Sequence, residues 1–93
     1  MNFVYKNIQF QRSEKEDWIV AKGEIHNASG ANYNSVAFRM VIFIKGAQVI
    51  NAIITINDFG AGKTRSFEKQ IEAIDSKSLD KIVRFEIHPQ GAY

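Results

Sequence analysis

Short runs of apolar residues recur along the chain, and most of them alternate with polar residues at a period of two. Such alternation is typical of β-strands, because successive side chains point to opposite faces of a sheet. Turn-forming residues separate the runs at intervals of about 8–12 residues, the spacing of sandwiches and barrels. The six expected strands are Phe3–Arg12, Asp17–Asn27, Tyr33–Lys45, Gln48–Asn57, Thr64–Ala73 and Lys81–His88.

The alternation also assigns side chains to the faces of these strands. The centre of the third run, Met40–Ile44, is apolar at every position, which predicts a central strand covered on both sides. Residues on one face of the second run are Ile19, Ala21, Gly23 and Ile25, and those on one face of the fourth run are Ile50, Ala52, Ile54 and Ile56. The inward residues expected elsewhere are Val4, Ile8 and Phe10 in the first strand, Phe67 and Ile71 in the fifth, and Val83, Phe85 and Ile87 in the sixth.

The separators between the runs carry turn chemistry. Asn27–Gly30 supplies residues that tolerate left-handed backbone or bond their own main chain, and this turn role also explains its match to a glycosylation sequon. Lys45-Gly46-Ala47 predicts a tight hairpin with Gly46 at positive φ. Residues 57–62 are expected to form a longer loop, and residues 76–80 a short helical turn. Pro89 is expected to end the last strand.

Composition then bounds the class of protein. A chain of 93 residues, 45% of them apolar, suits a single domain over residues 1–93. Together with the strand pattern, this predicts an all-β, immunoglobulin-like β-sandwich of six or seven antiparallel strands. A seventh strand would arise if the long third segment were split.

Charge and cysteine content narrow the function. The chain has no cysteine, which excludes disulfides, thiolate metal sites and cysteine nucleophiles. Its net charge is +2, and its basic residues are scattered, so nucleic acid is not an expected partner. The sequence shows neither an apolar stretch long enough to span a bilayer nor a signal-peptide pattern. It therefore suits a cytoplasmic protein, or a domain taken from a longer exported chain.

Candidate chemistry is sparse. Gly60-Ala-Gly-Lys-Thr64 resembles the end of a phosphate-binding loop, but Asn57 stands where that motif needs its first glycine, and a strand is expected to follow where the motif needs a helix. His26 and His88 lie late in predicted strands without companion metal ligands. We therefore expect neither an enzyme nor a cofactor site.

One stretch is similar to a known family. Val20-x-x-Gly23-x-Ile25-x-Asn27-x-Ser29, then Tyr33-x-x-Val36, and Gly62-Lys63 before Phe67 resemble the pattern of FxLYD domains. The resemblance covers about Trp18 to Ile71. The sequence departs from the family where Phe43-Ile44-Lys45 replaces its Tyr-Asp and where Ala61 replaces its proline. The resemblance implies an immunoglobulin-like sandwich from bacterial or archaeal proteins, often cell-surface or exported, without catalytic residues.

The leading hypothesis is a non-catalytic protein–protein interaction or structural module whose partner is unknown. Both Phe3–Arg12 and Gln48–Asn57 are apolar with few charges, and the second has none. An edge strand of that kind invites pairing with another chain, so a homodimer through an edge strand is expected.

An alternative hypothesis is a small inhibitor or regulator of another protein. It would present residues 57–63 to its target, with Phe59 as an anchor at the tip and Asp58 and Lys63 beside it. The competing interpretation places the Phe59 ring over the core.

Overall fold

The computed structural model describes residues 2–46 and 49–93 of the chain. These residues form six antiparallel strands in two three-stranded sheets, which confirms the predicted all-β class. The elements are β1 (Phe3–Arg12), β2 (Ile19–Asn27), β3 (Tyr33–Ile44), β4 (Val49–Phe59), β5 (Thr64–Ile71), the 3-10 helix η1 (Ser76–Lys81) and β6 (Ile82–Ala92).

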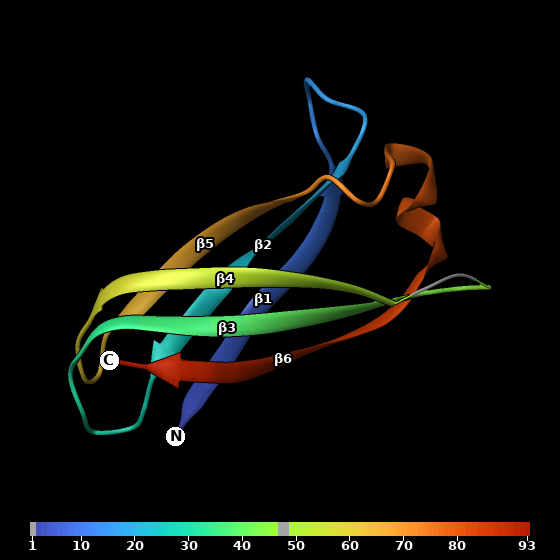
Figure 1. Ribbon diagram of the computed structural model, residues 1–93. Coiled ribbons are helices and arrows are strands. Elements are labelled where there is room, and N and C mark those ends of the chain that lie inside the picture. The colour runs from blue at the N-terminus through green and yellow to red at the C-terminus, as the bar shows by residue number, and fades with distance from the viewer. Residues whose placement is uncertain (1, 47–48) are drawn as a thin grey trace.

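The strand order is β1-β2-β5 in one sheet and β4-β3-β6 in the other. In Figure 1 the first sheet runs diagonally behind the second, so the two sheets lie face to face with their strands inclined to each other. Strands β2 and β3 are the central strands of their sheets. Met40 and Ile42 of β3 are buried in the core, and Val41, which points to the other face of the sheet, is also buried, beside the flanking strands β4 and β6. Strands β1, β5, β4 and β6 are the four edges of the described residues.

The core fills the space between the two sheets. Each of the strands β2 to β5 contributes every second side chain along most of its length, as the sequence predicts for Phe67 and Ile71. Gly23 also lies on this face. A side chain larger than glycine does not fit there, because a Cβ would overlap Ile8 and press on the Phe67 ring. The buried apolar residues that the sheets contribute to this core are Ile19, Ala21 and Ile25 from β2, Val36, Phe38, Met40 and Ile42 from β3, Ile54, Ile56 and Phe59 from β4, and Phe67 and Ile71 from β5.

The prediction for the first strand is wrong at Val4, which is 44% exposed. The pairing of β1 with β2 shifts register between Lys6 and Gln9, and Asn7 within this β-bulge has a φ of 54°. A bulge adds one residue to one strand, so the inward and outward positions exchange along it. Phe3 and Tyr5 therefore face the core before the bulge, whereas Ile8 and Phe10 do so after it.

The prediction for the last strand is wrong at two positions. Val83 lies at a register shift between β3 and β6 and is 61% exposed, although Ile87 packs on the core as expected. Pro89 does not end β6, which continues to Ala92 past a second shift. A proline is tolerated there because β6 is an edge strand and its outer side needs no N–H donor.

The other boundaries differ by a few residues. Strand β4 extends to Phe59, so the expected loop 57–62 is shorter than predicted, and β3 is one unbroken strand. The helical turn is present as η1. Gly46 has the predicted positive φ, 68°, whereas Ala47 and Gln48 of the β3–β4 connection lie outside the described residues.

Candidate functional site

The three predicted contact residues lie where β4 connects to β5. Asp58 and Lys63 are exposed there, but Phe59 is fully buried. The hypothesis that Phe59 stands at an exposed tip is therefore wrong, and the competing interpretation, with the ring over the core, is confirmed. The structure brings Asp58 and Lys63 to the same end of the molecule, without an apolar anchor between them.

The backbone at Asp58 explains the inward position of the Phe59 ring. Asp58 has a φ of 53°, a left-handed conformation that aspartate adopts more readily than most residues. This kink reverses the in–out alternation of β4, so that Phe59 points into the core. Its ring lies 5.8 Å from the Phe3 ring and 6.5 Å from the Phe38 ring, measured between centroids. The loop hypothesis thereby loses its anchor.

The segment that resembles a phosphate-binding loop is a β-turn. The N–H of Lys63 donates to the carbonyl of Gly60 over 3.1 Å, and Gly62 has a φ of 78°. Strand β5 begins at Thr64, so no helix N-terminus follows this turn to face a phosphate. The turn interpretation is confirmed.

Asn27 holds this end of the molecule together. Its side chain is fully buried, and Nδ2 donates to the carbonyls of Ala31 and Phe59 at 2.9 and 3.0 Å. Its Oδ1 accepts from both the N–H and the hydroxyl of Ser29. One amide thus fixes the β2–β3 turn against the end of β4, and its burial leaves no room for a glycan.

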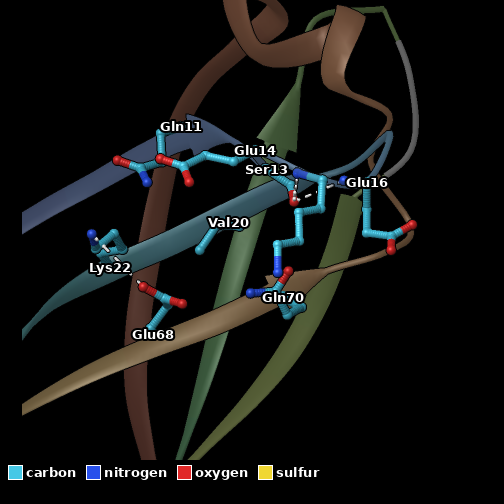
Figure 2. Close-up of a pocket in the computed structure, with 9 residues that line it drawn as sticks. Gln11, Ser13, Glu14, Glu16, Val20, Lys22, Glu68 and Gln70 are labelled. Atoms are coloured by element: carbon cyan, nitrogen blue, oxygen red, sulfur yellow. Dashed lines mark hydrogen bonds and ion pairs between the residues drawn. The ribbon is translucent and has the colours of Figure 1, made fainter.

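A groove of about 330 Å³ lies on the outer face of the first sheet, beneath the β1–β2 connection (Figure 2). Val20 forms part of its wall, and Lys22 and Glu68 approach each other at 3.7 Å across it. The other lining residues are Gln11, Ser13, Glu14, Lys15, Glu16 and Gln70. Small-molecule sites are lined mainly by apolar side chains, and this groove is mainly polar.

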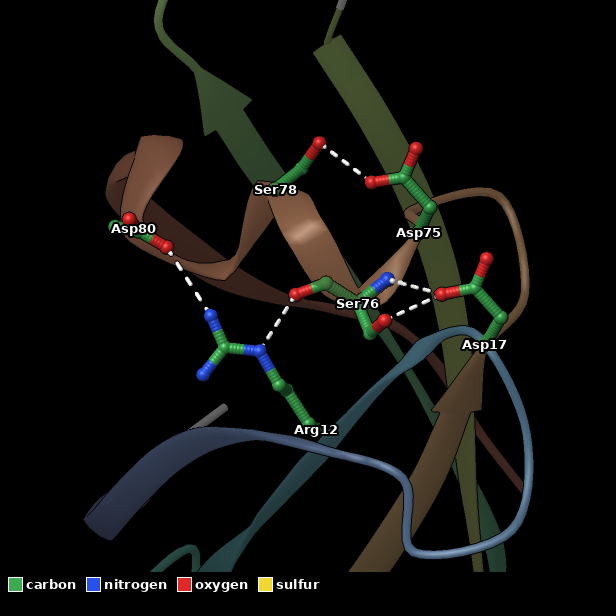
Figure 3. Close-up of polar contacts among 6 residues, drawn as sticks. All are labelled: Arg12, Asp17, Asp75, Ser76, Ser78 and Asp80. Carbon is green, nitrogen blue, oxygen red and sulfur yellow. Dashed lines mark hydrogen bonds and ion pairs between the residues drawn. The ribbon is translucent and has the colours of Figure 1, made fainter.

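A group of polar residues joins the β1–β2 connection to η1 (Figure 3). The Arg12 guanidinium donates to the Ser76 carbonyl at 2.9 Å and lies 3.4 Å from Asp80. The Ser76 hydroxyl and N–H both donate to the Asp17 carboxylate. These hydrogen bonds, that of the hydroxyl above all, hold the pKa of Asp17 below its usual 3.8. The arrangement explains how η1 is held, and it converges on no reacting centre.

Three of the four edge strands carry features that hinder pairing with another chain. Strand β1 has the bulge at Asn7, and β5 carries the charged residues Arg65, Glu68 and Lys69. Strand β6 has two register shifts and Pro89. Bulges, charges and prolines are the devices by which natural proteins protect exposed edges.

Strand β6 also carries an ionic group on its outer face. Glu86 accepts from His88 at 2.9 Å and from Arg84 at 2.6 Å. These hydrogen bonds, that of His88 first, lower the pKa of Glu86. A strand added at this edge would meet fixed charges as well as an irregular main chain.

Strand β4 differs from the other three edges. Its pairing with β3 keeps one register over the described residues of both strands, from Phe43 opposite Val49 to Tyr33 opposite Phe59. Asp58, near its end, is the one charged residue in its sequence. Its outward side chains are exposed, and Ile53 among them is 48% exposed. We call the main chain of Val49–Asn57, on the side away from β3, the β4 edge.

The sequence had singled out this strand and β1 as candidate edges from their lack of charge, and both lie at sheet edges. It had not distinguished the two, because the apolar Val4 hides the change of phase from Phe3 and Tyr5 to Ile8 and Phe10. Nor had it singled out Ile53, although Val49, Ile53 and Thr55 form a β-branched outward row on an uncharged strand.

Comparisons with known proteins add no assignment: no family model matches the chain, and neither a similar curated protein nor a similar solved structure was found. Among residues 2–46 and 49–93, no three His, Asp or Glu side chains are grouped so as to hold a metal ion. The same residues include no helix long and apolar enough to cross a membrane.

Proposed function

We propose that this chain is a non-catalytic interaction module that binds another protein by adding a strand at the β4 edge. The observation that carries the proposal is the contrast among the four edges. Three of them are bulged, charged or interrupted by proline, whereas β4 is regular and uncharged from Val49 to Asn57, before the kink at Asp58. Proteins protect edges that must stay unpaired, so an unprotected edge is the one available to a partner.

Strand addition suits the chemistry of this edge. Alternate main-chain N–H and C=O groups of β4 point away from β3 and would bond an added strand, which gives affinity without any particular side chain. Side chains then supply specificity. The inward row contains the half-buried Ile50 and Ala52, and the outward row contains Ile53, so an added strand would meet apolar surface on both faces.

We further propose that the sandwich is of the immunoglobulin-like class, with the FxLYD domains as the family it resembles. In an immunoglobulin-like sandwich with six strands, lettered A, B, C, C′, E and F along the chain, one sheet has the order A-B-E and the other C′-C-F. The order β1-β2-β5 and β4-β3-β6 agrees with this scheme, which supports the class. In that scheme β4 corresponds to C′. The glycine and asparagine of the resemblance, Gly23 and Asn27, both have structural roles.

Affinity capture from native lysate tests the proposed function when edge variants are compared. Ile53→Lys places a charge on the β4 edge, and Val83→Lys places the same charge at another exposed position, on the β6 edge. We expect partners retained by the wild type to be lost with Ile53→Lys and kept with Val83→Lys. A partner that is retained equally by all three proteins would contradict binding at β4.

A further inference from the structure

We infer that the strand received by the β4 edge is β4 of a second copy of this chain, paired antiparallel about a two-fold axis through Ile53. This inference rests on the proposed function and names its partner. Three properties of the β4 edge support pairing with a second copy: its residue pattern is self-complementary, it has no charge, and each molecule has one such edge among the described residues.

The residue pattern is self-complementary about Ile53. In an antiparallel pair centred there, Ile53 faces Ile53 and Asn51 faces Thr55 in the outward row. In the inward row Ala52 faces Ile54 and Ile50 faces Ile56, so apolar residues meet apolar residues and a small side chain meets a large one. The two half-buried inward residues, Ile50 and Ala52, would gain apolar neighbours.

Polar groups in the outward row are also accommodated. Asn51 Oδ1 accepts from the Arg39 guanidinium at 3.3 Å, and the Nδ2 donor of Asn51 would be available to Thr55 of the second copy. Residues 49–57 have no charge, so two copies bring no like charges into opposition along the paired segment. The remaining charge of β4, on Asp58, lies beyond that segment.

The number of open edges determines the assembly. Within the described part of the chain, β4 is the one edge without a bulge, a proline or several charges. Pairing β4 with β4 uses that edge in both copies and forms a continuous six-stranded sheet. An interface that uses the same surface twice closes at two subunits and does not propagate into a filament.

Sedimentation equilibrium on the purified full chain, from micromolar to millimolar concentration, tests the second copy as partner. We expect the wild type and Val83→Lys to form dimers, and Ile53→Lys and Ile53→Glu each to weaken the dimer at least tenfold, because like charges meet on the axis. An equimolar mixture of the two Ile53 variants is expected to associate more tightly than either alone. The glutamate variant faces Arg39 across the β3–β4 ladder, so it keeps the fold if the lysine variant does not.

Nitroxide spin labels test the register. The chain has no cysteine, so single cysteines at positions 51, 53 and 55 carry one label each. With the axis at Ile53, labels at 51 and 55 lie four residues from their own counterparts, a backbone separation of about 14 Å. They should report equal separations, and the label at 53 a shorter one. Unequal separations at 51 and 55 would overturn the Ile53 axis.

The remaining outcomes separate this inference from the proposed function. A wild type that stays monomeric to millimolar concentration, or dimers that survive both Ile53 variants, would overturn self-pairing. Assemblies larger than two would overturn the closed dimer. In each case the lysate comparison of Ile53→Lys with Val83→Lys still decides whether the β4 edge binds a different protein.

Discussion

At the scale of single residues, the end of the molecule around β4 and β5 depends on a few buried groups. Asn27 is buried and bonds two carbonyls and one serine. Phe59 fills the core beside the Phe3 and Phe38 rings. Both residues belong to segments with plausible functional motifs, a sequon and an exposed loop. Because both side chains are buried, we expect them to stabilise the fold and not to contact a partner. Stability measurements on variants distinguish these two roles.

Replacing Asn27 with alanine should lower the free energy of unfolding by about 2–3 kcal/mol, because the buried Phe59 carbonyl, the partly buried Ala31 carbonyl and the Ser29 hydroxyl lose their partner. Asn32→Ala is a matched control, since the Asn32 Oδ1 accepts a hydrogen bond from the Ala61 N–H in an exposed setting. That change should cost less than about 1 kcal/mol. Urea unfolding of the three proteins measures both values, and equal losses would contradict the central role of Asn27.

Replacing Phe59 with alanine should destabilise the fold by about 3–5 kcal/mol, the usual cost of removing a buried phenylalanine. Val83→Ala, on the exposed bulge of β6, should change stability by less than about 0.5 kcal/mol. Thermal and urea unfolding provide the measurement. An unchanged melting temperature in Phe59→Ala together with lost partner binding would restore the loop-anchor hypothesis.

At the scale of elements, the strands follow from the alternation of apolar and polar residues, and the departures follow from the main chain. All six strands were predicted, because period-two patterns persist on half-buried sheets. Val83 was mis-assigned at a register shift of β6. Val4 was mis-assigned and Phe59 was expected in a loop, each near a non-glycine residue with positive φ, Asn7 or Asp58. One left-handed residue exchanges inward and outward positions, and composition does not reveal where it lies.

Other departures depend on strand order, which is a tertiary property. Pro89 was predicted to end β6, and it is tolerated because β6 has a free side. For a similar reason, the sequence predicted β4 as a candidate edge but did not separate it from β1. The low charge of β4 is visible in the sequence, whereas the bulge that protects β1 is masked there by the apolar Val4 and becomes clear in the pairing register.

The bulge in β1 can be tested at Asn7, whose φ of 54° is costly for branched side chains. Asn7→Val should destabilise the fold by about 1–2 kcal/mol, the cost of left-handed backbone for such residues. Asn7→Gly, which removes the Cβ, is the control and should come close to the wild type. Denaturant unfolding distinguishes them. If valine were tolerated as well as glycine, the bulge would not have the left-handed geometry described.

The contact between the β1–β2 connection and η1 predicts a dependence on pH. Because Ser76 lowers the pKa of Asp17 in the folded state, ionised Asp17 stabilises the fold above its unfolded pKa, near 3.8. That stabilisation is lost as the pH falls through the folded pKa. The melting temperature of Asp17→Asn should therefore lie below that of the wild type at neutral pH, and the difference should shrink below about pH 4.

Thermal melts from neutral pH to about pH 2 test this prediction over the range where a carboxyl with a lowered pKa titrates. Comparing two proteins cancels the acid-dependent contribution of Glu86, which both retain. Ser76→Ala removes the hydroxyl donor and should reproduce much of the effect. A difference that stays constant down to the lowest pH would show that the Asp17 charge does not stabilise the fold.

At the scale of the whole molecule, the four sheet edges differ in how well they are protected from pairing. A sandwich of two three-stranded sheets exposes four edges, and three of them carry bulges, charges or proline. The fourth keeps a single register with β3 and presents an uncharged row centred on Ile53. We propose that partner choice and oligomeric state both depend on that one edge.

Amide hydrogen exchange, followed residue by residue by NMR, tests this account most directly. In dilute protein, the β4 amides that point away from β3 should exchange rapidly, while those bonded to β3 are protected. At millimolar concentration, or with a captured partner, the rapid set in Val49–Asn57 should become protected, and the outer amides of β1, β5 and β6 should not. Rapid exchange of the outer β4 amides under every condition, or protection that arises at another edge, would contradict the account.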